Sequence, residues 1–156
     1  KGFLSPAQGA AELAARLAQN RVVASDDPQR LEQLLFQQLQ IAPQFAGVYY
    51  GSEGGDFVYV MRSPTGPGEF RSKIIDHIGG KRRTRLVWRN DDFSVVEQRE
   101  DPEDAFDPRG RPWYVKARAE RTTIWTDPYI FFSSQQPGIT LAAPVFKPAF
   151  PKWRVV

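Results

Sequence analysis

The spacing of apolar residues near the start of the chain predicts two helices. Leucines three and four residues apart form one face after Asp27-Pro28, an acid that can cap a helix followed by a proline suited to its first turn. We expect this helix to end before Pro43 and to direct its leucines into the core: Leu31, Leu34, Leu35 and Leu39. An earlier helix is predicted from Ser5-Pro6, where Leu13 and Leu17 form a narrow stripe suited to packing on a neighbour.

From Phe45 onward the pattern changes to strand-forming residues separated by turns. Phe45–Tyr50 and Phe57–Met61 flank a glycine-rich turn, which predicts a hairpin. Further strands are predicted at 70–78, 84–89, 93–99, 129–132 and 139–146. We expect the 45–61 hairpin and the 129–146 strand pair to join in one antiparallel sheet, with Gly138 in the turn between the last two strands.

These elements predict an α+β fold in which N-terminal helices pack on a central antiparallel sheet. The 156 residues suit a single domain spanning 1–156, and hydrophobic and charged fractions of 41% and 25% are ordinary for a globular protein. The sequence has no cysteine, which excludes disulfides and thiolate metal sites, and no apolar run of about 18 residues. Lys1 is not an initiator methionine and the end at Val156 resembles the opening of a strand, so we expect a piece of a longer protein.

The residue types that usually carry catalysis or bind metals are sparse. His77 is the only histidine, and without cysteine or a second histidine it cannot complete the usual zinc or catalytic groups. Asp101, Glu103 and Asp104 lack the alternating spacing and glycine of a calcium loop, so we expect a solvated acidic turn. We therefore predict no enzymatic activity, no metal and no cofactor.

Basic residues gather in the stretch Gly79–Arg85. Lys81 is followed by Arg82, whereas a phosphate-binding loop requires serine or threonine at that place. Four basic residues within 81–85 can contact a phosphate backbone, but on the shoulder of a hairpin they are more often solvated. Nucleic acid is not the expected partner. An alternative interpretation stays open, namely a non-catalytic interaction module that binds an anionic polymer or a membrane surface through 81–85.

The segment 106–129 has the densest set of aromatic, proline and charged residues. Pro108 and Pro112 restrict the backbone on both sides of Arg111, and helix formers follow from Trp113 to Glu120. Arg111 offers a planar fork that matches a carboxylate, and Trp113, Tyr114 and Tyr129 offer apolar walls with polar tips. Two interpretations remain: a ligand-binding loop, or a core loop in which Arg111 pairs with Asp107 or Asp127.

Three segments in order, Phe106–Tyr114, Trp125–Tyr129 and Gly138–Val145, resemble the double Cache family of bacterial extracytoplasmic sensor domains. The resemblance is strong over 106–146 and extends back to the 45–61 hairpin. It implies that the chain is a PAS-like module in the periplasmic part of a receptor. Within that part, the chain would be mainly the half that lies farther from the membrane and binds the ligand. Flanking segments outside this chain would cross the membrane, and a cytoplasmic output domain would receive the signal. The resemblance also implies a homodimer through the N-terminal helix.

The same resemblance implies a set of ligand-binding residues. Family members that bind amino acids hold the carboxylate with the arginine and tryptophan at the positions of Arg111 and Trp113, beside Tyr114 and Tyr129. Two positions depart from those members, because Phe106 replaces a tyrosine and Phe131 replaces an acid. The carboxylate end of an amino-acid site is therefore expected, without the hydroxyl and the acid that those members carry at these two positions. The implied partner is a small organic acid or amino-acid-like molecule.

Overall fold

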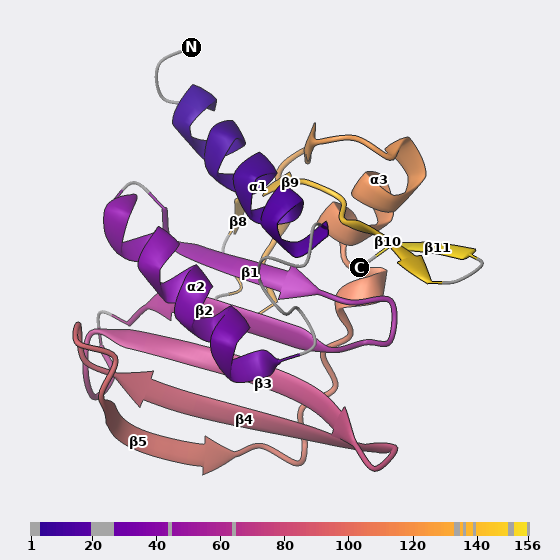
Figure 1. Cartoon of the computed structure of the whole chain (residues 1–156). Coiled ribbons are helices and arrows are strands. Elements are labelled where there is room, and N and C mark those ends of the chain that lie inside the picture. The colour runs from indigo at the N-terminus through magenta and orange to yellow at the C-terminus, as the bar shows by residue number, and fades with distance from the viewer. Residues whose placement is uncertain are drawn as a thin grey trace. The chain divides into compact units, whose positions relative to one another are not determined.

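The computed structural model describes residues 4–19, 27–43, 45–63, 65–132, 135, 137–138, 140–149 and 152–155 (Figure 1). The chain forms two compact units. The first, here called the sheet unit, is Ala24–Ala105. The second, here called the terminal unit, combines Lys1–Val23 with Phe106–Val156. Each unit is described by itself below.

The sheet unit is built on a five-stranded antiparallel sheet of order β1-β2-β3-β4-β5. The hairpin and the three strands predicted after it are confirmed, and consecutive strands lie side by side in Figure 1. The strand β4 begins earlier than predicted, because Gly79 and Gly80 adopt φ of 65° and 76° and close a two-residue turn that pairs Ile78 with Lys81. The bounds are β1 Gly47–Gly51, β2 Phe57–Arg62, β3 Phe70–Ile78, β4 Lys81–Arg89 and β5 Val95–Glu100.

The helix α2, Pro28–Ile41, packs on this sheet and confirms the predicted core face. Asp27 caps it by accepting hydrogen bonds from the backbone N–H groups of Gln29 and Arg30. Burying each of its core leucines stabilises the unit by roughly 1.5–3 kcal/mol. Leu34, predicted for the core, is only half-buried, and Phe36 is buried in addition. The buried cluster contains Leu31, Leu35, Phe36, Leu39, Val58, Val60, Phe70, Ile74 and Val87.

The terminal unit contains two helices and short paired strands. The helix α1 starts one residue before Ser5, contacts β9, and buries Ala15 beside Val145 and Ala143. The predicted helix after the proline-rich loop is confirmed as α3. The bounds are α1 Leu4–Gln19, the 3₁₀ turn η1 Pro108–Gly110, α3 Pro112–Glu120, β6 Ile124–Trp125, β7 Tyr129–Ile130, β8 Pro137–Gly138, β9 Leu141–Ala142, β10 Phe146–Ala149 and β11 Lys152–Val155.

The prediction that the 129–146 strand pair joins the 45–61 hairpin in one sheet is wrong. In the described chain β7 pairs only with β8, β9 pairs with β6, and the five-stranded sheet contains β1 to β5 alone. Pro137 and Pro144 lack the amide hydrogen that a long ladder needs, so these strands stay two residues long. Of the predicted turn, residues 133, 134 and 136 lie outside the described part, as does Ile139.

Gly138 lies in β8 opposite Tyr129 and not in the turn as predicted. Any side chain at this position would meet the ring of Phe131. Glycine is therefore needed here for the close approach of an aromatic ring, and this reason cannot be distinguished from turn geometry in the sequence alone.

Candidate ligand-binding site

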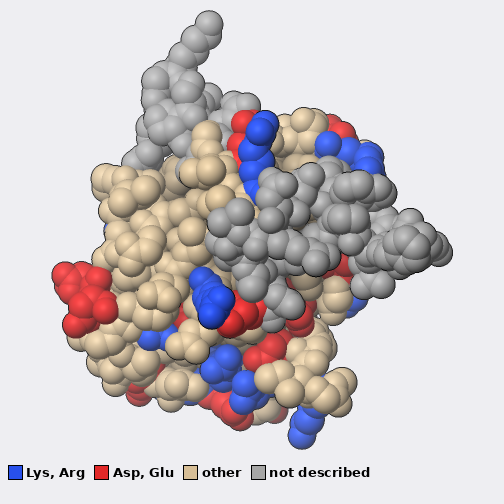
Figure 2. Space-filling model, in the orientation of Figure 1, with Lys and Arg blue, Asp and Glu red and all other residues tan. Residues whose placement is uncertain are grey.

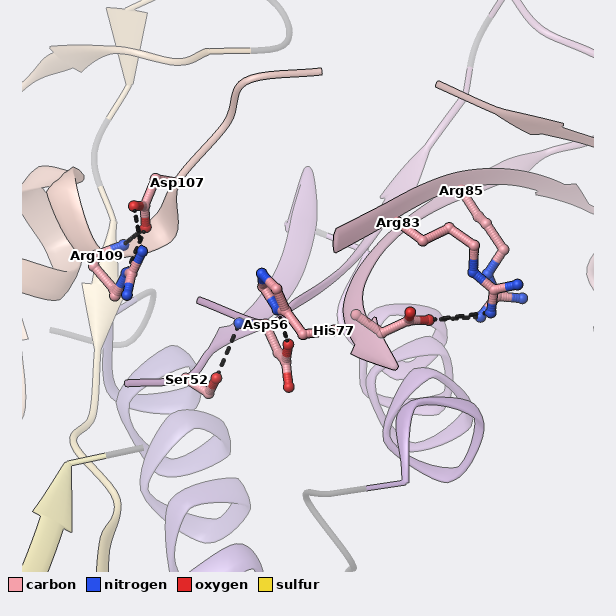
Figure 3. Close-up of polar contacts among 8 residues, drawn as sticks. Ser52, Asp56, His77, Arg83, Arg85, Asp107 and Arg109 are labelled. Carbon is pink, nitrogen blue, oxygen red and sulfur yellow. Dashed lines mark hydrogen bonds and ion pairs between the residues drawn. The ribbon is translucent and has the colours of Figure 1, made fainter. Parts of the chain in front are cut away.

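The loop before α3 is held by its own acid. Asp107 caps η1 by accepting the backbone N–H of Arg109 at 3.0 Å, and its carboxylate pairs with the Arg109 guanidinium at 2.8 and 2.9 Å (Figure 3). The hydrogen bonds and charge of Asp107 raise the pKa of Arg109 above its ordinary value. Asp107 is thus engaged by Arg109, and this leaves Arg111 to be positioned by other groups.

Arg111 caps the start of α3 in an extended conformation, with φ −82° and ψ 149°, as its place before Pro112 favours. Its Nη2 donates to the main-chain carbonyl oxygen of Ile130 at 2.8 Å. Its guanidinium carbon lies 5.5 Å from the centre of the Tyr129 ring, a cation–π distance. Among the described residues, Arg111 has no carboxylate partner. The group is oriented, therefore, without being neutralised by an acid in that part of the chain.

Tyr129 is supported on two sides. Its hydroxyl lies 2.6 Å from Thr140 Oγ1, and its ring meets the ring of Phe131 edge to face at 5.1 Å. Phe131 in turn lies over Gly138. The structure therefore brings three of the predicted site residues, Arg111, Tyr129 and Phe131, into one continuous set of contacts.

The other three predicted site residues make different contacts. Trp113 and Tyr114 lie in the first turn of α3, are buried, and meet edge to face at 5.8 Å. Phe106 is buried and packs edge to face on Phe132 at 5.1 Å. These rings give the loop and the helix a rigid apolar base, and their part in binding stays a prediction.

Sequence reasoning missed several residues that shape this region. Lys116 on α3 donates to the carbonyl oxygen of Trp125 at 2.6 Å, and the buried threonines Thr126 and Thr140 are hydrogen-bonded to each other. Thr140 lies in the apolar run of the Gly138–Val145 segment. Its hydroxyl in that run was the only feature of the sequence that could have indicated a structural role. Main-chain carbonyl acceptors such as that of Ile130 leave no mark in a sequence.

The prediction of a solvated acidic turn at 101–104 is wrong for Asp104. Its side chain is only 4% exposed and forms ion pairs with Lys73 at 2.5 Å and Arg82 at 2.7 Å. The Thr84 hydroxyl donates a hydrogen bond to the same carboxylate at 3.3 Å. Burial alone would raise the pKa of Asp104, but hydrogen bonds and charges from Lys73 and Arg82 outweigh it and hold that pKa below its ordinary value. An acid in a turn can reach back to basic residues of a distant strand, which its local sequence does not reveal.

The basic stretch 81–85 is largely paired within the sheet unit. Arg82 binds Asp104, and Arg83 and Arg85 lie 3.3 and 3.6 Å from Asp76 (Figure 3). On the face shown in Figure 2, basic and acidic side chains are interspersed. These pairings weigh against an anionic polymer or membrane as the partner of this stretch.

His77 is on the surface, and its Nδ1 lies 2.6 Å from Asp56 (Figure 3). This agrees with the surface role predicted for it. In the described part of the chain, no cluster of histidine and acidic side chains is arranged to hold a metal ion. None of the helices described there has the length and apolar character needed to cross a membrane.

Two solved structures with a similar fold are ligand-binding domains of chemoreceptors. The chain is 22% identical to that of Pseudomonas fluorescens CtaA in complex with L-isoleucine, with a TM-score of 0.57, covering 99% of this chain and 49% of that one. It is 18% identical to that of Pseudomonas aeruginosa PAO1 PctB in complex with L-Gln, with a TM-score of 0.50, covering 98% and 48%.

No protein-family model and no curated protein matches the sequence. The chain spans about half the length of the two solved domains. At these identities the likeness establishes the fold alone, an α+β fold shared with these two chemoreceptor domains, and the resemblance seen in the sequence is confirmed at the level of the fold.

Proposed function

We propose that this chain is a non-catalytic, extracytoplasmic sensor domain that binds a small carboxylate-bearing molecule at Arg111. The observation that carries the proposal is the state of Arg111, whose charge is oriented by the Ile130 carbonyl and the Tyr129 ring and has no acid partner among the described residues. Both molecules bound to the similar chemoreceptor domains, L-isoleucine and L-glutamine, carry a carboxylate.

The chemistry of Arg111 suits this role. A guanidinium has five N–H donors, and the hydrogen bond to Ile130 uses one of them. The remaining donors can form two parallel hydrogen bonds with a carboxylate, a geometry that lysine cannot reproduce. Pro112, directly after Arg111, and Pro108, three residues before it, restrict the backbone from which the side chain extends, so little backbone entropy is lost on binding.

The other predicted residues complete the proposal. Tyr129 and Phe131 provide an aromatic wall beside Arg111, and Trp113, Tyr114 and Phe106 hold the loop from which it extends. We place the domain 1–156 on the periplasmic side of a membrane receptor, as the membrane-distal module of a longer protein. Flanking segments would anchor it and a cytoplasmic output domain would receive its signal.

A ligand screen followed by an arginine series tests the proposal. L-isoleucine, L-glutamine and a panel of organic acids are added at millimolar concentration, and we expect at least one to raise the melting temperature. Calorimetry on that compound should then show a loss of affinity of about 10- to 150-fold for Arg111→Ala, because a charged hydrogen bond contributes roughly 1.5–3 kcal/mol. Arg111→Lys should not restore it.

The matched control is Arg118→Ala, which removes an exposed arginine from α3, the helix that follows Arg111. We expect it to bind like the unchanged protein. A panel in which no carboxylate stabilises the protein, or an Arg111→Ala variant that binds as tightly as the control, would contradict the proposal.

A further inference from the structure

Two buried threonines pair with each other at the ends of β6 and β9. Thr126 and Thr140 are each 7% exposed. The backbone N–H of Thr126 donates to the Thr140 carbonyl at 2.9 Å, and the backbone N–H of Thr140 donates to Thr126 Oγ1 at 2.9 Å. These two bonds continue the short β6–β9 ladder and fix the position of the Thr140 backbone.

The Thr140 hydroxyl connects these two hydrogen bonds to the Tyr129 side chain. Its Oγ1 lies 2.6 Å from the Tyr129 hydroxyl oxygen, and the Tyr129 ring lies 5.5 Å from the guanidinium carbon of Arg111. A tyrosine ring pivots about its own Cβ, so a hydrogen bond at its far end limits that motion. The contacts therefore run without interruption from Thr126 through Thr140 and Tyr129 to Arg111.

We propose that Thr140, with Thr126 behind it, is a positioning residue for ligand recognition at Arg111. Thr140 acts through Tyr129: it sets the ring on which the guanidinium lies, and so sets the direction of the donors that a carboxylate would meet. The expected effect of Thr140 on carboxylate binding rests on the function proposed above. The effect of Thr140 on the position of Arg111 depends only on contacts within the terminal unit.

The hydroxyl is the informative part of Thr140. Valine has nearly the same shape, so Thr140→Val removes the hydroxyl and its bond to Tyr129 with little change in side-chain volume, and it leaves the half-buried Tyr129 hydroxyl without this partner. Serine keeps the hydroxyl and loses only the methyl group, so Thr140→Ser should restore the behaviour. Thr123→Val is the matched control, because Thr123 is a half-buried threonine of the same unit.

The first measurement needs no ligand. The Arg111 side-chain signals in nuclear magnetic resonance depend on the Tyr129 ring current, so Thr140→Val should shift them, while Thr140→Ser and Thr123→Val leave them near their original positions. Unchanged Arg111 signals in a folded Thr140→Val variant would overturn the proposal.

The second measurement uses acetate and L-isoleucine as carboxylate probes, titrated while the Arg111 signals are followed. Thr140→Val should weaken probe binding by about 2- to 12-fold, the loss expected for one neutral hydrogen bond. Tyr129→Phe removes the same hydrogen bond. The double variant Thr140→Val/Tyr129→Phe should therefore bind the probe with the affinity of whichever single variant binds less tightly. Fully additive losses would show that Thr140 acts independently of Tyr129 and would overturn the proposal. If neither probe moves Arg111 in the unchanged protein, the proposed function fails for these carboxylates, and the ligand-free shift still decides the positioning.

Discussion

The two units differ in the partners of several of their cationic side chains. In the sheet unit, three cations face carboxylates in the most buried pairs: Glu32 binds Arg89 at 2.9 Å, and Asp104 binds Lys73 and Arg82. In the terminal unit, Arg111 and Lys116 donate instead to main-chain carbonyl oxygens, at 2.8 and 2.6 Å. A carboxylate neutralises its partner, whereas a carbonyl orients a cation and leaves its charge in place. Each unit has an exception: the exposed Arg109 pairs with Asp107 in the terminal unit. In the sheet unit, Arg62 donates to the main-chain carbonyl oxygens of Leu39, Ala42 and Phe45.

The backbone shows the same contrast. Strands of the sheet unit have five to nine residues, and their register shifts between Trp88 and Arg89 where β4 pairs with β5, whereas β6 to β9 have two residues each. Long ladders and closed ion pairs favour stability, and short ladders with oriented, unneutralised cations favour recognition. We therefore expect substitutions of paired charges in the sheet unit to change mainly unfolding, and substitutions around Arg111 to change mainly binding.

The largest expected effect is on the buried pair of the sheet unit. Glu32 is 1% exposed on its side chain and accepts two hydrogen bonds from Arg89, so Glu32→Ala leaves that arginine buried without its carboxylate. We expect the free energy of unfolding to fall by about 3–5 kcal/mol, measured by urea denaturation. Gln33→Ala, at an exposed position of the same helix, should change it by less than about 0.5 kcal/mol. Equal losses of unfolding free energy in Glu32→Ala and Gln33→Ala would show that the buried ion pair is not what stabilises the sheet unit.

Asp104→Asn should follow with a loss of about 2–3 kcal/mol, because charged hydrogen bonds to Lys73 and Arg82 become neutral ones. Glu103→Gln, the exposed neighbour, is the control and should melt like the unchanged protein. Asp104→Asn should leave carboxylate binding at Arg111 intact if the charge of this cluster serves stability alone. A binding defect without a melting defect would show that the cluster belongs to recognition.

The contribution of Asp104 should also depend on pH. Its pKa is lowered in the folded protein from an ordinary value of 3.8, so the unfolded chain takes up the proton first as the pH falls. The stability difference between the unchanged protein and Asp104→Asn should be full above about pH 5 and should shrink below about pH 4. Denaturation curves at several pH values measure it. A difference that grew on acidification would have the wrong sign for a depressed pKa.

A smaller effect is expected at Gly138. Gly138→Ala should displace the Phe131 ring and lower stability by about 1 kcal/mol, at the low end for overpacking because Phe131 is only half-buried. Since Phe131 supports Tyr129, carboxylate binding should weaken in the same variant. Gly110→Ala is the control, because a side chain there meets no other atom within 4 Å. If Gly138→Ala and Gly110→Ala had the same stability and the same affinity for the carboxylate, the contact between Gly138 and Phe131 would contribute to neither.

The sheet unit could be predicted largely from the sequence, and the terminal unit only in part. Strand β3 matches its predicted range because alternation and glycine turns act locally. Phe93 was placed in a strand, but it has φ 71° in the turn before β5 and packs on Phe36 at 5.0 Å, a long-range contact. Arg111 was identified by its side-chain chemistry. The Tyr129 ring was predicted as part of the same site, but the Ile130 carbonyl that orients Arg111 and the Thr140 hydroxyl that holds the ring depend on folded geometry that no motif records.

The smallest expected effect on stability lies on the outward face of α1. Leu13 is 57% exposed, so Leu13→Glu should leave the melting temperature of the isolated chain nearly unchanged. Ala15, on the same helix, is buried beside Val145 and Ala143, so Ala15→Glu should lower melting markedly because it buries a charge. If the Leu13 and Leu17 stripe mediates the homodimer that the family resemblance implies, sedimentation analysis should show weaker self-association in Leu13→Glu at unchanged stability. A Leu13→Glu variant that melts early and associates normally would place the stripe in the core of the terminal unit and exclude it as a partner surface.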